Sequence, residues 1–210
     1  MPPTELILNV AVGGILTGLI YGLMALGLSV IFGVVRVVNF AHGEMMTIAP
    51  LLTVVFGAVA VLIADMLVPA RRLTPITVAL VALGAAAVVI TAQGGGVTSA
   101  LAGAYVTGPF VSYLGLLGIT VTTITLLMTP DHLGDRGYPT AEFASILLFA
   151  LAGAILVAAS TDLVTLFIGL ELLVIPGYLL AGYAKRDPLS TEGAVKYFLL
   201  GSFSSAILLF

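Results

Sequence analysis

The run LVTLFIGLELLVIPGYLLAGY, residues 163–183, decides the fold class of this chain. About 20 mainly apolar residues are enough to cross a bilayer as a helix, and this run has that length. Its one charged side chain is Glu171, near the centre. A carboxylate at bilayer depth costs at least about 2.5–3.5 kcal/mol, so such residues usually mark a functional site. The run therefore predicts a membrane helix that carries a candidate functional residue.

Further apolar runs lie on both sides of this one and predict six more membrane helices. They are Leu6–Val35, Thr47–Val68, Pro75–Ala92, Pro109–Thr129, Ala141–Ala159 and Gly193–Phe210. Gly94-Gly95-Gly96 and Thr129-Pro130-Asp131 are predicted to be loops between helices, and Asp187-Pro188 a polar entry to the last helix. Alternating strand patterns are absent from the sequence.

The composition agrees with this pattern. Hydrophobic residues make up 60% of the 210 residues and charged residues 8%, against about 25% charged in soluble domains. A net charge of −3 is too small to indicate a nucleic-acid partner. The absence of cysteine excludes disulfides, thiolate catalysis and cysteine-based metal sites. The sequence predicts an all-α polytopic membrane protein with about seven transmembrane helices.

Basic residues predict the orientation in the membrane. Five of them fall in loops that share one side if every run crosses, and one, Arg36, falls on the other side. The five are Arg71, Arg72, Arg136, Lys185 and Arg186. Since loops rich in lysine and arginine stay inside, that side is predicted to be cytoplasmic.

A second charged residue, Lys196, is the only lysine placed well inside an apolar run. With Glu171 it forms an acid and a base on consecutive helices joined by a short connection, which suggests proton transfer across one interface. Two plainer interpretations stand beside this one: Glu171 as a structural polar group between helices, and Lys196 as a lysine reaching for the membrane surface. Asp162 is predicted to cap the helix that carries Glu171. His42 and Glu44 supply too few ligands for a metal site.

The sequence from Gly18 to Glu44 ends in Asn-Phe-Ala-His-Gly-Glu, residues 39–44. This segment resembles the start of the permease subunits of branched-chain amino-acid ABC transporters. The resemblance ends near Met46, and no ATPase-docking loop follows it. Residues 1–45 are therefore interpreted as a permease-like helix and turn, joined to a different protein.

Residues 46–210 resemble the antiporter-like membrane subunit N of NADH-quinone oxidoreductase, respiratory complex I. The specific parts are Gly-Leu-Glu-Leu at 169–172 and Ala-Val-Lys-Tyr-Phe-Leu-Leu-Gly at 194–201. Full-length members of that family are much longer, so this part is interpreted as a truncated member. The resemblance implies that Glu171 and Lys196 are the membrane glutamate and lysine of the proton path.

The leading functional hypothesis is a proton-translocating subunit of NADH-quinone oxidoreductase, which couples quinone reduction to proton transfer through buried Glu171 and Lys196. The resemblance implies no cofactor on this chain, with NADH, flavin, iron–sulfur clusters and quinone used by partner subunits. It also implies the other membrane-arm subunits and the lipid bilayer as partners, and the bacterial inner (plasma) membrane as location. The alternatives are a branched-chain amino-acid ABC permease subunit and a non-functional hybrid membrane protein.

Overall fold

The structure is a computed structural model that describes residues 37–68 and 73–209, with side chains from residue 44 onward. The chain divides into two units, Met1–Gly43 and Glu44–Phe210, and only the second is described below. The predicted helix Leu6–Val35 and the basic residues Arg36, Arg71 and Arg72 lie outside the described residues.

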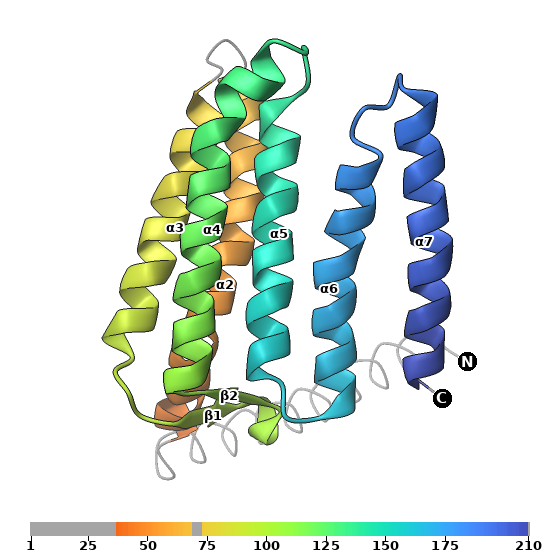
Figure 1. Cartoon of the computed structure of the whole chain (residues 1–210). Helices are drawn as coiled ribbons and strands as arrows, with labels where there is room; N and C mark the ends of the chain where they lie inside the picture. The colour runs from red at the N-terminus through yellow and green to blue at the C-terminus, as the bar shows by residue number, and fades with distance from the viewer. Residues whose placement is uncertain (1–36, 69–72, 210) are drawn as a thin grey trace, which may run out of the picture. The chain divides into compact units, whose positions relative to one another are not determined.

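The described part of the chain contains six helices and a short hairpin (Figure 1). The helices are α2 (Val37–Leu67), α3 (Thr74–Ala92), α4 (Pro109–Gly134), α5 (Thr140–Ala159), α6 (Leu163–Ala181) and α7 (Pro188–Leu209). Five of these, α2 from Glu44 and α3 to α6, are long and apolar enough to cross a membrane. The predicted all-helical membrane fold is confirmed, and each predicted run within the described residues forms a helix.

The main core lies where α5 packs against α2, α3 and α4. Small and branched side chains fill it, with Val54 and Ala58 from α2, Leu83 from α3, Leu126 from α4 and Leu148 from α5 all buried. One polar contact crosses this core, because the Ser145 hydroxyl donates to the Ala58 carbonyl at 3.0 Å. A hydroxyl in an apolar core needs such a partner to offset its lost hydration. Helices α6 and α7 extend the array from the other side of α5 (Figure 1).

The predicted loop at Thr129-Pro130-Asp131 is wrong, because α4 continues through Pro130 to Gly134. Gly137 ends the helix instead: it has φ +67° and donates to the Gly134 carbonyl, while Tyr138 N–H donates to Leu133. These two bonds form a Schellman motif, which satisfies the last carbonyls of a helix. Pro130 lacks an N–H, so the Leu126 carbonyl loses its helical donor, but the helix continues for one more turn to Gly134.

The region between α3 and α4, for which no strand pattern was found, contains a two-stranded antiparallel hairpin. Its strands are β1 (Thr98–Ala100) and β2 (Tyr105–Thr107), and Tyr105 is fully buried. The connecting residues Leu101 and Ala102 have φ values of 54° and 55°, an uncommon conformation outside glycine. The Glu44 carboxylate accepts a hydrogen bond from Leu101 N–H at 2.5 Å and helps to hold this turn.

Candidate functional site

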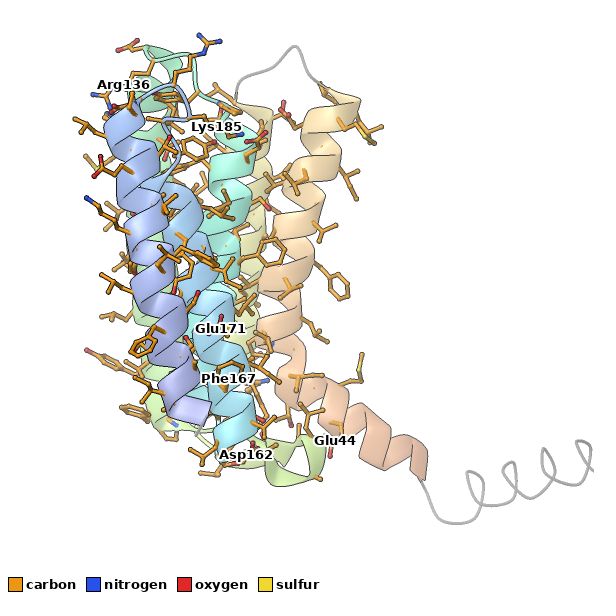
Figure 2. All side chains as sticks on the ribbon, turned by 90° about the vertical axis from the view of Figure 1, so that its right-hand side faces the viewer. Glu44, Arg136, Asp162, Phe167, Glu171 and Lys185 are labelled. Carbon is orange, nitrogen blue, oxygen red and sulfur yellow. The ribbon has the colours of Figure 1, made fainter. Side chains whose placement is uncertain are left out.

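Glu171 is the ninth of the 19 residues of α6, so it lies in the middle of the helix as predicted. Figure 2 shows Asp162, Phe167 and Glu171 following one another along this helix. The start of the helix is set by Asp162, whose carboxylate accepts from Thr165 N–H at 2.8 Å and from its hydroxyl at 2.9 Å. The predicted cap is therefore confirmed. These two hydrogen bonds, the backbone one first, hold the pKa of Asp162 below its usual range.

Two glycines bring α6 against α5 and so determine which way Glu171 faces. A Cβ added to Gly153 of α5 would lie 2.4 Å from the Leu173 nitrogen. A Cβ added to Gly169 of α6 would lie 2.8 Å from the Val157 nitrogen. Glycine at both positions lets the two backbones touch, as small residues commonly do between membrane helices. Glu171 is two residues from Gly169, so it points away from this contact and is half-buried.

Proline modifies the backbone next to Glu171. Pro176 is buried within α6 and has no N–H, so the Leu172 carbonyl, four residues earlier, lacks its helical donor. Gly153 of α5 packs against this same region, since its added Cβ would lie 2.6 Å from the Leu172 carbonyl carbon. The missing helical hydrogen bond therefore falls at the Leu172 carbonyl, one residue after Glu171.

Helix α7 packs on α6 through an aromatic cluster that the sequence analysis did not find. The Tyr178 ring makes edge contacts with Tyr197 and Phe198, at centroid distances of 4.8 and 5.5 Å. Its hydroxyl lies against Gly201, where an added Cβ would come within 1.8 Å. Tyr178 is two turns after Glu171, and the two side chains interact electrostatically. Glu171 therefore lies at the edge of the α6–α7 interface, beside Tyr178.

Lys196 is exposed rather than buried, which corrects the sequence-based prediction. Its side chain is 69% exposed and forms an ion pair with Glu192, one turn earlier in α7. The positions of α7 that face α6 are taken by Ala194, Tyr197 and Gly201, which leaves Lys196 on another side of the helix. Within the described residues, no hydrogen bond or ion pair joins Lys196 to Glu171. The two residues are on neighbouring helices, but the structure does not bring them together.

The remaining charged residues gather at the helix ends. Arg136 and Lys185 lie at one end of the helices, and Glu44 and Asp162 lie at the other (Figure 2). This agrees with the prediction that the loops carrying Arg136 and Lys185 share one side of the membrane. Among the described residues, no group of three or more histidine, aspartate or glutamate side chains could hold a metal ion.

Comparisons with known proteins agree with this architecture. The family model for "NADH:quinone oxidoreductase/Mrp antiporter, TM" matches residues 160–210, which include Glu171 and Lys196. NAD(P)H-quinone oxidoreductase subunit 2 of Prochlorococcus marinus strain NATL2A is 37% identical over 164 residues, 77% of this chain and 31% of that protein. Subunit 2 of Trichodesmium erythraeum is 37% identical over 167 residues, 78% of this chain and 32% of that protein.

Two solved structures share the fold. A chain of respiratory complex I from Thermus thermophilus superposes with a TM-score of 0.63 and 24% identity, covering 75% of this chain and 34% of that one. A chain of the archaeal membrane-bound sulfane sulfur reductase gives 0.60 and 20% identity, covering 78% and 34%. The present chain spans about a third of the length of the curated relatives it matches. Over this region the chain is similar to the antiporter-like membrane subunits of the NADH-quinone oxidoreductases.

Proposed function

We propose that this chain takes part in proton translocation by a NADH-quinone oxidoreductase, with Glu171 as the central protonatable group. One observation carries the proposal: a half-buried carboxylate at the middle of a membrane helix, inside the segment that matches the family model. A carboxylate at that depth is costly, and carboxylates in membrane helices commonly belong to proton relays. The names of the curated relatives supply the class of complex.

The surroundings of Glu171 suit a group that gains and loses a proton. The side chain forms no ion pair with any described residue. Tyr178 lies within electrostatic reach, and its hydroxyl is a hydrogen-bond donor and acceptor. Pro176 leaves the neighbouring Leu172 carbonyl as a further acceptor. Two polar groups therefore lie on the same helix as Glu171, and we propose that they assist the passage of a proton.

Lys196 is the second residue of the proposed proton path, but as an exposed residue that does not contact Glu171 directly. Its ion pair with Glu192 lies on a side of α7 that does not face α6. Coupling to Glu171 would run through the α6–α7 packing at Tyr178 rather than through direct contact.

The proposal also covers location and partners. The chain is a multi-pass membrane protein. We place it in the bacterial plasma membrane, with the connections that carry Arg136, Lys185 and Arg186 on the cytoplasmic side. Assembly with other membrane-arm subunits is proposed from the curated relatives. NADH oxidation, flavin, iron–sulfur clusters and quinone reduction are assigned to those partners.

A proton-pumping assay tests the role of Glu171. Residues 46–210 would replace the matching part of a full-length subunit 2, and inside-out vesicles would be assayed for NADH-driven proton uptake and quinone reduction. Glu171→Gln should abolish most proton uptake while the complex still assembles on native gels. Glu142→Gln, a matched change at an exposed helix end, should leave uptake unchanged. Full proton uptake per quinone reduced in the Glu171→Gln vesicles would disprove the role.

A further inference from the structure

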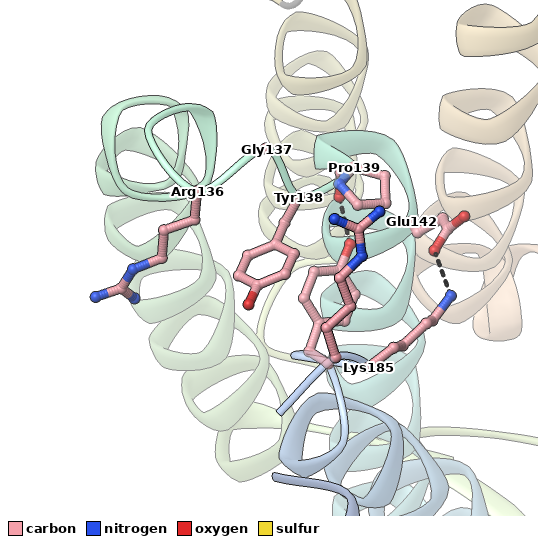
Figure 3. A pocket seen from close by; sticks show the side chains of 8 residues that line it. Arg136, Gly137, Tyr138, Pro139, Glu142 and Lys185 are labelled. Atoms are coloured by element: carbon pink, nitrogen blue, oxygen red, sulfur yellow. Dashed lines mark hydrogen bonds and ion pairs between the residues drawn. The ribbon is translucent and has the colours of Figure 1, made fainter. Parts of the chain in front are cut away.

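A pocket of about 300 Å³ lies where the α4–α5 connection meets the α6–α7 connection (Figure 3). Its polar lining comes from Arg136, Tyr138, Glu142, Tyr183, Lys185 and Arg186. Three of these side chains are cationic and one is anionic, so the pocket carries an excess of positive charge. None of these residues belongs to the Glu171 site.

Among the described residues, one of the three cations of the pocket is paired with a carboxylate. Lys185 Nζ lies 3.6 Å from Glu142 Oε2, which pairs one cation with the one carboxylate. Arg136 Nη1 lies 2.5 Å from His132 Nε2, and as a permanent cation the arginine must be the donor. Arg186 forms no hydrogen bond or ion pair with any residue that the structure describes. Neither of these two guanidinium groups forms an ion pair with a described carboxylate.

Tyrosine holds the two connections together. The Tyr183 hydroxyl donates to the Pro139 carbonyl, and its ring makes edge contacts with Tyr138 at 6.0 Å and Phe143 at 5.6 Å. Burial first, and the nearby Glu142 carboxylate second, raise the pKa of Tyr183 to about 12, so this donor stays protonated. The end of α6 is thereby fixed to the start of α5. The basic residues of both connections are held around one space.

The depth of the pocket relates it to the membrane. It lies just beyond Gly134 and Ala181, where α4 and α6 end, and just before Thr140 and Pro188, where α5 and α7 begin. Residues directly beyond the ends of membrane helices lie at the level of the lipid headgroups. Apolar side chains are exposed close to these ends, with Leu179 53% and Leu189 76% exposed. A ligand in the pocket could therefore extend an apolar part along the helices.

We propose that this pocket binds the phosphate of an anionic phospholipid. Guanidinium groups bind phosphate oxygens by paired hydrogen bonds, and Arg136 and Arg186 form no ion pair with a described residue. Tyr138 adds a hydroxyl from the α4–α5 connection. Basic pockets between membrane helices are known receptors for such headgroups. A lipid fits better than a free anion because the pocket lies at headgroup depth and has exposed apolar side chains close by.

The proposal is tested on the purified full chain in neutral detergent, with bound lipid counted by native mass spectrometry. Phosphatidylglycerol should bind, and zwitterionic phosphatidylcholine should bind far more weakly. The double variant Arg136→Gln/Arg186→Gln should bind phosphatidylglycerol about tenfold more weakly or worse. Lys196→Gln removes a cation outside the pocket and should bind like the unmodified chain.

Further measurements distinguish a phospholipid site from a general anion site and from an effect on folding. Arg186→Gln alone should already weaken binding, and this residue has no described contact whose loss could unfold the chain. Competition with inorganic phosphate at matched ionic strength distinguishes a lipid from a free anion, and full displacement of phosphatidylglycerol would show a general anion site and overturn the lipid assignment. Equal binding of phosphatidylglycerol by the double variant and by Lys196→Gln would overturn the pocket assignment.

Discussion

The side-chain amide of Gln93 donates a 2.6 Å hydrogen bond to the carbonyl oxygen of Met46. Pro50 stands four residues after Met46 within α2, and its missing N–H leaves this carbonyl without its helical donor. Gln93 directly follows α3, so one side chain both satisfies the carbonyl that Pro50 leaves free and ties the end of α3 to the third turn of α2. A proline in one helix is thus compensated from the next.

The first prediction concerns this bond. Gln93→Leu should lower the free energy of unfolding by about 1 kcal/mol, since a hydrogen bond is lost and a carbonyl loses its partner. Pro50→Ala supplies a backbone N–H at position 50, and the loss caused by Gln93→Leu should then be smaller. Denaturant unfolding of the unmodified chain, the two single variants and the double variant in detergent micelles gives the coupling energy between the two sites. Strictly additive effects would show that Gln93 does not compensate for the N–H that Pro50 lacks.

The second prediction concerns the contact between α5 and α6. Gly153→Ala places a methyl group 2.4 Å from a backbone nitrogen, so the helices must separate, at a cost of about 1–3 kcal/mol. Gly84→Ala in α3 is the matched control, because no atom lies within 4 Å of its added Cβ. There alanine should stabilise by about 0.5–1 kcal/mol, as expected for an open helix position. Thermal unfolding in micelles should separate the two variants in opposite directions.

The third prediction concerns the packing of α7. Gly201→Ala would push the Tyr178 hydroxyl away, and the ring has little room because Tyr197 and Phe198 hold its edges. We expect a loss of about 1–3 kcal/mol. Gly193→Ala, in the same helix with no atom within 4 Å, should show no loss. If both variants unfold at the same temperature, α7 is not packed on Tyr178 as described.

The fourth prediction is a pH dependence at the start of α6. Hydrogen bonds from Thr165 lower the pKa of Asp162 in the folded chain, so the charged cap stabilises the helix above the ordinary pKa of about 4. That contribution should be lost as the pH falls through the lowered pKa. Asp162→Asn keeps a capping side chain that does not titrate, and its stability should change less between neutral and acidic pH. Identical pH profiles for the two proteins would contradict the cap as the source.

The site was predicted in part. Glu171 stands out in the sequence because a lone carboxylate in an apolar run is rare, and the middle of its helix follows from counting residues. Lys196 drew attention for the same reason, yet its partner proved to be Glu192 on its own helix. Which side of α7 faces α6 depends on where Tyr178 finds room, and Gly201 provides that room. The spacing of residues in the sequence does not show how α7 is rotated about its axis relative to α6.

The sequence by itself determined the membrane class and which apolar runs form the described helices. Both follow from local properties: the length of apolar runs, and end signals such as Asp162 and Asp187-Pro188. Only the tertiary structure decided which residues contact one another across the helices. The Gln93–Met46 bond joins residues 47 positions apart, and the α5–α6 contact at Gly153 and Gly169 requires two backbones in a particular register. The free energy of transferring a segment into lipid is a sum over its residues, so the sequence contains it. Helix packing depends on how the helices are rotated against one another, which only the tertiary structure shows.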